Sequence, residues 1–375
     1  MSKYLFVCPR FHTNQIALIE QLQQQGNQVV ILVQYQTELE NHKNVQLIQT
    51  RQAFCSKLLI KVIEKLSGKT SEKLIYRFFF STHREIRNYV ATIAPDVVIV
   101  RDQLMNSVAW AMALRKRHDV LVVDYNQRPL FYQSDNTLKS RFFQFRNKFI
   151  PKYHYTPVYK REFEESIKLE KAKHTIFIPF VVNSNNTIVR EASTKIRILD
   201  VGKYRPYKNH KLLVSAFSKL PDKERYHVTI VGQKFNMVEK KYFAELEAMI
   251  KNMKLENYFN LVCNVPNEQM DAYYLANDIL VLSSSHELAS YAILEAMSYK
   301  LAIISSDDNG TAWYVLQSKA GSLFKTKDSD SLASAIRQIG SSDYAAMGER
   351  GYCFVKENCN ITAFNQGIKT LSTEK

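Results

Sequence analysis

Short apolar runs alternate with amphipathic segments along the second half of the chain. Apolar runs rich in Val, Ile and Leu predict buried strands, whereas apolar residues that recur every three or four positions predict helices. Strands are expected at 195–202, 226–232, 257–265, 277–285 and 300–308, and helices at 209–220, 238–253, 268–276 and 290–298. This alternation predicts a parallel sheet with helices on both faces.

The first half repeats this alternation with less regularity. Strands are expected at 3–9, 27–34, 95–102, 119–126 and 173–180, with helices at 14–26 and 104–118. From about Asp343 to the C-terminus the chain predicts helices without a further strand. The fold class predicted is therefore α/β, with two doubly wound parallel sheets.

A polar stretch with an Asn/Ser cluster, residues 180–195, separates the two halves and is the expected hinge. We predict an N-terminal domain over 1–185, a C-terminal domain over 186–355, and a C-terminal helix, 356–375, that packs back toward the N-terminal domain. Two such sheets that face each other across a cleft direct the carboxyl ends of their strands into it, where ligands bind.

The composition fits a folded cytoplasmic protein. Hydrophobic residues make up 46% of the chain, yet no apolar run approaches the ~18 residues that span a bilayer. The first apolar run, Tyr4 to Cys8, is short and ends at Pro9, so we expect a buried strand there rather than a signal peptide. The five cysteines lack any C-x-x-C spacing and are expected to be reduced thiols.

The positive charge is concentrated in the first half of the chain. Residues 1–190 hold 28 Lys and Arg against 15 Asp and Glu, a net +13, which leaves +2 of the total +15 for residues 191–375. An anionic surface or an anionic substrate is the expected partner of the first half. The alternative is a basic surface that only keeps the protein soluble.

Two basic segments of the first half also carry apolar or aromatic residues. The segment Ser56 to Leu66 places lysines beside an apolar helix face, and 139–163 interleaves Lys and Arg with Phe. Such segments suit an anionic bilayer, so peripheral association with the inner face of the plasma membrane is a hypothesis. The alternative is that these apolar faces belong to the domain core.

The stretch HELASYAILEAM contains two glutamates eight residues apart, Glu287 and Glu295. On one helix, residues at that spacing differ by about 80° and do not share a face. We expect Glu287 in the loop after the strand 277–285, Ser290 as the N-cap, and Glu295 inside the following helix. Both carboxylates can then reach one ligand, and a carboxylate suits a vicinal diol such as ribose. Alternatively, the two are unrelated surface charges.

The stretch VGKYRPYKNHKLL predicts a second binding element. Gly202 and Lys203 follow a strand, and Lys208 precedes a helix capped by Asn209, with Arg205 as a third cation. Glycine permits close backbone approach, and a helix start offers free N–H groups. Two lysines there suit a diphosphate, whose charge grows as it leaves. Lysines that are merely solvated are the alternative.

From Ile196 to about Phe324 the sequence resembles the retaining glycosyltransferases of family four, which have the GT-B fold. The similarity rests on VGKYRPYKNHKLLVSAF, VTIVGQ, and NVPNEQMDAYYLANDILVLSSSHELASYAILEAMSYKLAIISSDDNG. The resemblance implies that Lys203 and Lys208 bind the diphosphate of a nucleotide sugar and that Glu295 holds its ribose. It places Glu287 beside the transferred sugar, with a role in catalysis or sugar binding. Asn309, in the last of these stretches, is counted among the substrate-binding candidates, together with Gly202 and Ser290.

This sequence departs from the family at three places. Ser290 stands where the family usually has glycine, and it keeps the backbone N–H. The usual glycine pair after the first strand is replaced by PRFHTNQ, and the N-terminal histidine that many members direct at the donor sugar has no clear match. His12 and Gln127 are therefore candidates for the N-terminal side of the site.

The predicted function is retaining transfer of a sugar from a nucleotide sugar to a hydroxyl of a glycan or lipid-linked acceptor, in cell-envelope or exopolysaccharide assembly. Lys208 and Glu287 are the expected catalytic residues. We expect a UDP-linked donor and neither a cofactor nor a metal, because the lysines neutralise the diphosphate. The motif Asp328-Ser329-Asp330 is expected to cap a helix instead of binding a metal.

Two other functions compete with this one. A nucleotide-sugar epimerase on the same architecture would use the same donor site. A basic nucleic-acid-binding protein would account for the charge, but it leaves the two glutamates unexplained and lacks a recognisable recognition element. No nucleic-acid partner is expected.

Overall fold

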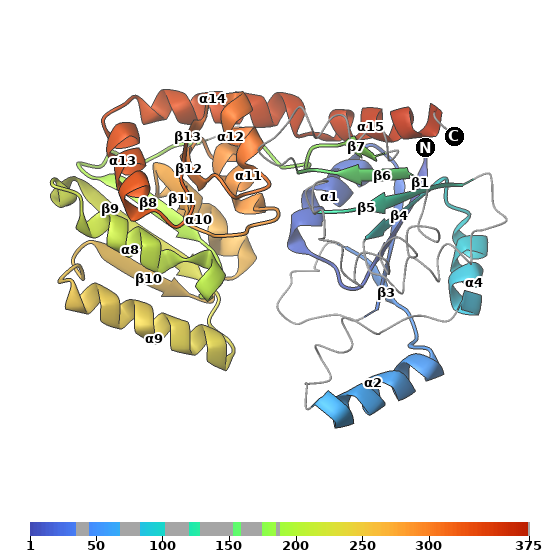
Figure 1. Ribbon diagram of the computed structural model, residues 1–375. Helices are drawn as coiled ribbons and strands as arrows, with labels where there is room; N and C mark the ends of the chain where they lie inside the picture. The colour runs from blue at the N-terminus through green and yellow to red at the C-terminus, as the bar shows by residue number, and fades with distance from the viewer. Residues whose placement is uncertain are drawn as a thin grey trace.

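The computed structural model describes residues 1–34, 45–67, 83–101, 120–127, 153–158, 175–184 and 188–373. Two α/β domains lie side by side, each built on a parallel sheet (Figure 1). The helices α14 (Tyr344–Asn358) and α15 (Ile361–Thr373) run along the same side of both domains, α14 over the C-terminal one and α15 over the N-terminal one. The predicted fold class is thus confirmed.

The N-terminal sheet has seven parallel strands in the order β3-β2-β1-β4-β5-β6-β7. Their bounds are β1 Lys3–Cys8, β2 Gln28–Val33, β3 Leu47–Gln49, β4 Val97–Arg101, β5 Leu121–Tyr125, β6 Tyr153–Thr156 and β7 Thr175–Phe177. Five of them confirm the strands expected from the sequence. The other two, β3 and β6, are very short and were not predicted, because only pairing with β2 and β5 makes them part of a sheet. The predicted helix 104–118 lies outside the described residues.

Among the described residues this domain also contains the 3-10 helix η1 (Thr13–Gln15) and the helices α1 (Ile16–Gln24), α2 (Phe54–Ser67) and α4 (His83–Ile93). Helix α1 packs on one face of the sheet and α4 on the other. Successive side chains of β1 point to opposite faces, as in any strand. Phe6 therefore packs with Ile19 of α1 and Phe364 of α15, whereas Leu5 packs with Ile86 of α4.

The C-terminal sheet has six parallel strands in the order β10-β9-β8-β11-β12-β13. Their bounds are β8 Ile196–Val201, β9 Tyr226–Gly232, β10 Phe259–Cys263, β11 Ile279–Leu282, β12 Ala302–Ser306 and β13 Gly321–Phe324. All five strands expected here are confirmed. Strand β13 was missed, because its four residues, GSLF, carry too little apolar character to predict a strand before it pairs with β12.

The four helices expected in this domain are confirmed as α8 His210–Ser218, α9 Met237–Asn252, α10 Met270–Leu275 and α11 Tyr291–Ser298. The domain also contains η2 Pro206–Lys208, η3 Lys223–Arg225, η4 Asn267–Gln269, α12 Ala312–Ser318 and α13 Ser329–Gly340. Leu213, Leu246 and Ile336 bring α8, α9 and α13 onto one sheet face, and Leu294 and Val355 bring α11 and α14 onto the other. At the start of α13 the Asp328 side chain accepts hydrogen bonds from the Asp330 and Ser331 amides, which confirms its capping role.

The connection between the sheets is tied to both domains. The hydroxyl of Tyr314 on α12 donates to the Pro157 carbonyl at 2.8 Å and accepts from the Phe180 amide at 3.2 Å. The Tyr291 hydroxyl on α11 donates to the Val181 carbonyl at 2.8 Å. Two tyrosines of the C-terminal domain thus hold the chain where it crosses between the sheets.

The strand order of the C-terminal sheet reverses between β8 and β11. Chain connections run outward in opposite directions from these two strands, which makes their carboxyl ends a topological switch point. Ligands of open α/β sheets bind at such topological switch points. The loops after β8 and β11 hold Lys208 and Glu287, respectively.

The packing of α15 on the N-terminal domain generates a stability prediction. Phe364 is 1% exposed and meets the Tyr155 ring edge-on, with ring centroids 6.1 Å apart. We expect Phe364→Ala to lower the free energy of unfolding by roughly 3–5 kcal/mol, because it leaves a cavity between α15 and the sheet. Denaturant unfolding measures this loss, and Lys369→Ala, on the exposed side of the same helix, is the matched control. Equal losses of unfolding free energy in Phe364→Ala and Lys369→Ala would contradict the packing of Phe364 between α15 and the sheet.

Candidate active site at the β8–β11 switch point

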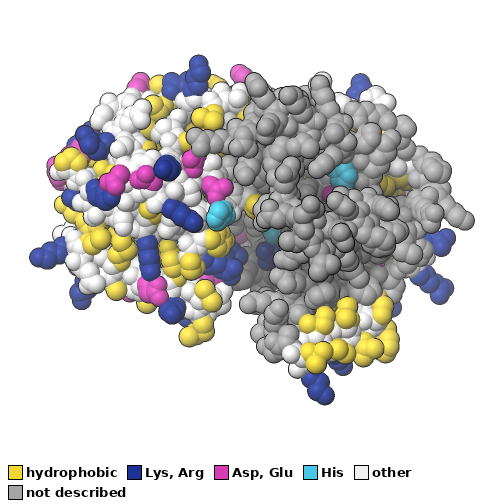
Figure 2. All heavy atoms as spheres, in the orientation of Figure 1, with side chains coloured by type: hydrophobic (Ala, Val, Ile, Leu, Met, Phe, Trp, Pro, Cys, Tyr) yellow, Lys and Arg dark blue, Asp and Glu magenta, His cyan; other side chains and the backbone are white. Residues whose placement is uncertain are grey.

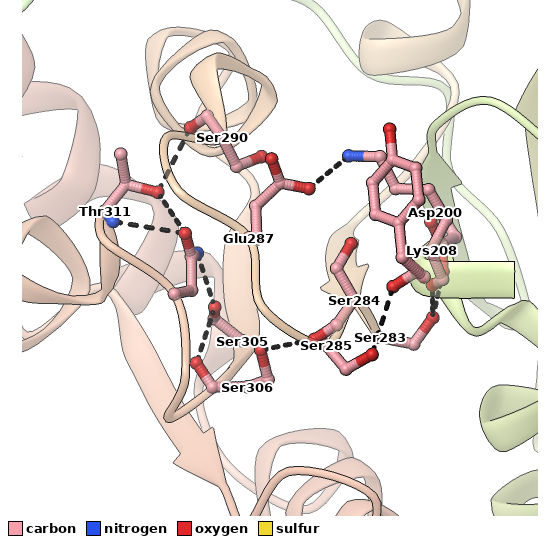
Figure 3. Close-up of polar contacts among 12 residues, drawn as sticks. Asp200, Lys208, Ser283, Ser284, Ser285, Glu287, Ser290, Ser305, Ser306 and Thr311 are labelled. Atoms are coloured by element: carbon pink, nitrogen blue, oxygen red, sulfur yellow. Dashed lines mark hydrogen bonds and ion pairs between the residues drawn. The ribbon is translucent and has the colours of Figure 1, made fainter. Parts of the chain in front are cut away.

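Lys208 and Glu287 form an ion pair at the switch point. The Lys208 Nζ lies 2.5 Å from a carboxylate oxygen of Glu287, and each side chain is only 13% exposed (Figure 3). Lys208 ends η2 in the loop after β8, and Glu287 lies in the loop after β11. The tertiary structure thus joins two residues 79 positions apart, and both were singled out from the sequence as catalytic candidates.

Two glycines let the loop that carries Lys208 lie close to the sheet. A Cβ on Gly202 would meet the Cδ of Lys208 at 3.0 Å, so the lysine side chain lies across the glycine. A Cβ on Gly232, at the end of β9, would meet the Gly202 carbonyl oxygen at 2.3 Å. Tyr204, fully buried in the same loop, places its hydroxyl 2.9 Å from the carbonyls of Ile230 and Val262. Gly202 and Tyr204 therefore fix the first part of the loop, N-terminal to Lys208, against the sheet.

The serine run after β11 holds the top of this loop by its main chain. The Ser283 Oγ lies 3.0 Å from the Lys208 carbonyl oxygen, and the Ser285 amide donates to the Tyr207 carbonyl at 2.8 Å. Ser284 is tied in turn to β12, because the Ser306 hydroxyl donates to its carbonyl at 2.7 Å. Figure 3 shows this line of serines beneath the ion pair. These bonds explain why a polar SSS sequence follows a fully apolar strand.

Asp200, on β8, is buried below Lys208. Its carboxylate oxygen lies 2.9 Å from the Ser283 Oγ, and burial raises the pKa of Asp200 from 3.8 to about 7 despite opposing effects of the Ser283 hydrogen bond and the Lys208 charge. His210 lies beside it, with Nε2 3.7 Å from the carboxylate, beyond hydrogen-bond distance. Burial lowers the pKa of His210 to about 3, so this imidazole is neutral near pH 7.

The protonation state of Asp200 decides which hydrogen bonds Ser283 can make. The Ser283 hydroxyl has one hydrogen and two neighbouring acceptors, the Asp200 carboxylate and the Lys208 carbonyl. When Asp200 is protonated, its own O–H donates to the Ser283 Oγ and the serine hydrogen goes to Lys208. When Asp200 is ionised, one acceptor loses its hydrogen bond. The protonated acid therefore completes the chain that positions Lys208.

The loop carrying Glu287 is held from the β12 side. Glu287 pairs with Asn309 in an isolated parallel bridge, and its carbonyl accepts from the Gly310 amide at 3.0 Å. The Asn309 side chain donates to Ser305 and accepts from the amide and hydroxyl of Thr311. Because that buried amide is used within the loop, Asn309 orders the loop beside Glu287, and its role in substrate binding stays a prediction.

Ser290 and His286 flank Glu287 in this loop. Ser290 lies at the N-cap position of α11, as predicted, but its side chain makes no capping bond, and its carbonyl accepts from the Thr311 hydroxyl. His286 adopts a left-handed backbone conformation, φ 57°, and its Nδ1 lies 2.7 Å from Asp308. The two residues turn the chain sharply before α11 begins.

Glu295 lies inside α11, as predicted, and contacts a tyrosine of α10. The Tyr274 hydroxyl donates to the Glu295 carboxylate at 2.8 Å, and the Tyr274 ring stacks on Tyr299 with centroids 5.2 Å apart. Burial raises the pKa of Glu295, although the Tyr274 hydrogen bond opposes this. One carboxylate oxygen is therefore oriented by the protein. Sequence reasoning missed Tyr274, which it placed in the helix 268–276 without a role in the site.

The other two cations of the loop have different surroundings. Arg205, expected as a third cation for the diphosphate, is instead paired with Glu239 of α9 at 2.8 Å. Glu239 also completes the capping box of α9 with Asn236. The Arg205–Glu239 ion pair therefore joins the loop after β8 to the start of α9. Lys203 is half-buried at the end of β8 and lies near enough to His12 of the N-terminal domain to affect its pKa.

The N-terminal candidates lie at the carboxyl ends of β1 and β5. Burial and the charges of Arg101, Arg10 and Lys203 hold the pKa of His12 well below its usual value, so the ring is neutral near pH 7. Gln127 accepts from the Arg101 guanidinium at 2.7 Å and donates to the Tyr125 hydroxyl at 2.8 Å. His12 therefore faces the C-terminal domain, whereas contact of Gln127 with a substrate stays a prediction.

Among the described residues, no group of three or more His, Cys, Asp and Glu side chains is arranged to hold a metal ion. The charged groups at the switch point are the cations Lys203 and Lys208 and the carboxylates Glu287 and Glu295. Cations beside a helix start can neutralise a phosphate, and an oriented carboxylate can accept from sugar hydroxyls. The site is thus equipped for a ligand with an anionic and a hydroxylated part.

The sequence of the C-terminal domain is similar to that of known proteins. Residues 181–352 match the model described as glycosyl transferases group 1. Over 104 residues the chain is 29% identical to mannosylfructose-phosphate synthase of Agrobacterium fabrum, a match that covers 27% of this chain and 23% of that protein. Over residues 181–352 the chain is thus similar to the glycosyl transferases group 1.

Solved structures show the same fold over the whole chain. A glycosyltransferase from Rickettsia africae aligns with a TM-score of 0.72 at 18% identity, covering 99% of this chain and 98% of that one. HepE of Anabaena in complex with UDP aligns with a TM-score of 0.72 at 13% identity over 100% of both chains. Sucrose-phosphate synthase from Thermosynechococcus elongatus gives 0.68 at 16% identity, over 100% and 99%. The fold is that of the GT-B glycosyltransferases.

The buried acid below Lys208 generates a prediction for pH-dependent stability. Between about pH 4 and 7, Asp200 is ionised in the unfolded chain but still protonated in the folded one, because its folded pKa is about 7. The folded state then binds more protons, so this group lowers stability as the pH rises, by on the order of 4 kcal/mol in total. We expect Asp200→Asn, whose amide N–H can donate to Ser283, to lose this slope.

Thermal unfolding of both proteins from pH 4 to 8 measures the difference. Glu247→Gln, at an exposed position of α9 in the same domain, is the control and should leave the wild-type slope unchanged. Parallel curves for wild type and Asp200→Asn would show that Asp200 is already ionised in the folded protein at low pH.

Proposed function

We propose that this protein is a retaining glycosyltransferase that transfers a sugar from a UDP-linked donor to a hydroxyl acceptor. The observation that carries this proposal is the Lys208–Glu287 pair at the switch point, within the family-matched segment. Similar structures were solved with UDP and with UDP-glucose, which supports a uridine nucleotide as donor. Retention and assignment to family four rest on the resemblance of the Glu287 to Glu295 spacing.

In the proposed mechanism the diphosphate binds over the start of α8, between Lys203 and Lys208. Without a ligand, Lys208 is neutralised by Glu287 at 2.5 Å. An arriving diphosphate, with more charge than one carboxylate, draws the ammonium toward itself and leaves Glu287 to accept from hydroxyls of the donor sugar. Glu295, oriented by Tyr274, accepts from the ribose hydroxyls. One carboxylate thus serves the sugar and the other the nucleotide.

Transfer then breaks the bond between the anomeric carbon and the phosphate oxygen. The acceptor oxygen forms its bond on the same face, and its proton passes to an oxygen of the departing phosphate, which retains the anomeric configuration. Lys203, Lys208 and the helix start stabilise the charge that grows on the diphosphate. The cations supply this stabilisation without a metal ion in our proposal.

The acceptor is proposed to approach from the N-terminal domain. His12 is held neutral near Lys203, and its Nε2 accepts a hydrogen bond from the Arg10 guanidinium at 3.3 Å, so it would contact the acceptor without adding charge. A glycan or lipid-linked acceptor fits a role in cell-envelope or exopolysaccharide assembly on the cytoplasmic side. These assignments rest on the family resemblance and on the positive charge of the first half.

Removal of either donor-binding side chain is expected to weaken donor binding. Lys208→Ala and Glu295→Ala each delete a charged hydrogen-bond partner, at a cost of roughly 1.5–3 kcal/mol, or roughly 10- to 150-fold in dissociation constant. Titration calorimetry with UDP and UDP-glucose measures the loss. Lys211→Ala is the matched control, because that α8 lysine pairs outward with Glu245. Unchanged affinity in both site variants would refute the site.

The nature of the reaction is tested separately. UDP should raise the unfolding temperature more than GDP or ADP at equal concentration, because stabilisation grows with ligand over dissociation constant. A transferase incubated with UDP-glucose should accumulate free UDP only when a membrane glycolipid fraction is added. Recovery of an epimerised sugar nucleotide without that fraction would identify an epimerase instead.

A further inference from the structure

Helix α2 (Phe54–Ser67) presents its larger apolar face to solvent. Phe54, Leu58, Val62 and Leu66 follow at intervals of four residues, one turn apart, and are 80%, 55%, 47% and 82% exposed. Leu59, on the same side, is 37% exposed. Figure 2 shows these side chains as a continuous apolar patch at the lower right, where Figure 1 draws α2. Five large apolar side chains of one helix therefore contact water.

The side of α2 that faces the protein is narrower and less apolar. Ser56 and Ile60 are buried, at 0% and 5% exposed, and Ile63 is half-buried. A helix on a globular protein normally buries its widest apolar stripe, because each buried side chain gains favourable transfer free energy. Here that stripe faces outward, and contiguous exposed apolar patches mark interaction sites.

A row of lysines borders this apolar face. Lys57, Lys61 and Lys65 repeat at the same four-residue interval, one position away from the apolar row, and all three are exposed. The one acidic residue of α2, Glu64, is half-buried. The surrounding half of the chain carries a net +13, counted as 28 Lys and Arg minus 15 Asp and Glu in residues 1–190. The occupant of this surface is therefore expected to be both apolar and negatively charged.

We propose that α2 is a docking helix that inserts Phe54, Leu58, Leu59, Val62 and Leu66 between the headgroups of an anionic lipid bilayer. An interfacial helix needs an apolar face, flanking cations and a moderate overall hydrophobicity, and α2 has all three. The lysine row reaches the lipid phosphates while the apolar row enters the acyl boundary. Within the described ranges, no helix combines the length and apolar character needed to cross a bilayer, so docking is superficial.

This interaction is independent of the donor site in the other domain. Vesicle flotation tests it with phosphatidylglycerol–phosphatidylcholine vesicles and with pure phosphatidylcholine vesicles. The protein should float with the anionic vesicles at low salt, bind them more weakly as salt rises, and leave the neutral vesicles largely unbound. Failure to float with anionic vesicles at low salt would overturn the proposal.

Two sets of variants locate the interaction on α2. Leu58→Asp with Val62→Asp should abolish flotation, because two charges would have to enter the acyl boundary. Lys57→Glu, Lys61→Glu and Lys65→Glu together should weaken binding by at least about a hundredfold, because each lysine lost near the surface costs about fivefold and each added glutamate is repelled by the lipid. Both sets should keep wild-type affinity for UDP and the wild-type unfolding temperature, since the altered side chains contact solvent.

Matched controls carry the same changes on other exposed surfaces. Lys240→Glu, Lys241→Glu and Lys251→Glu on α9 reverse the same number of charges, and Val189→Asp with Leu316→Asp adds the same two acids. Flotation of the control proteins should remain close to wild type. An equal loss in controls and α2 variants would mean that net charge alone drives binding, which contradicts docking by this helix.

Cys55 offers a direct readout on the helix itself. It is exposed and adjoins the apolar row, and an environment-sensitive fluorophore can be attached to it after Cys353→Ser removes the other exposed cysteine of the described residues. Emission should shift to the blue on addition of anionic vesicles. A shift that depends on protein concentration and not on vesicles would assign the face to a second copy of the chain, against our proposal.

Discussion

The position of Lys208 depends on how its main chain is tied to the neighbouring strand. Ser283 and Ser285, directly after β11, contact the carbonyl oxygens of Lys208 and Tyr207. These contacts hold the loop after β8 against the end of β11. They do so although the chain runs in opposite directions across the sheet after the two strands. Side-chain contacts alone would let a lysine on a loop sample many positions, at a cost in entropy on binding. The contacts of Ser283 and Ser285 restrict the main chain of Lys208 before a ligand binds.

The same network explains why a buried acid and a buried imidazole lie below a charged site. Burial lowers the pKa of His210 to about 3, so the imidazole is neutral near pH 7, and it raises the pKa of Asp200 to about 7, so the acid is protonated below that pH. Below about pH 7 neither group competes with a ligand for the ammonium. The charge that does pair with Lys208 is that of Glu287. In the mechanism we propose, this pair keeps the lysine neutralised until a diphosphate, with its higher charge, displaces the carboxylate.

The N-terminal domain presents two surfaces of interest and is attached to the C-terminal domain at two places. It contributes His12 to the side that faces Lys203, and it presents α2 on another part of its surface. Two tyrosines at the crossing between the sheets and the packing of α15 join it to the C-terminal domain. In our proposal, a domain attached in this way brings an acceptor at a lipid surface toward a donor held by the C-terminal domain.

The sequence by itself determined the strands whose apolar runs are long enough to be buried on both faces, and from them the two parallel sheets. It also determined which loops form the candidate site, because Gly202, Lys208, Glu287 and Glu295 follow or flank those strands. The short strands β3, β6 and β13 were decided only by pairing with longer neighbours. Tertiary structure alone decided that Lys208 meets Glu287, that Arg205 turns away to Glu239, and that Tyr274 orients Glu295. It also decided that the wider apolar face of α2 points outward. Periodicity reports which residues share a face, but contacts between residues far apart in the chain, and the side on which a face is covered, arise only when the elements pack.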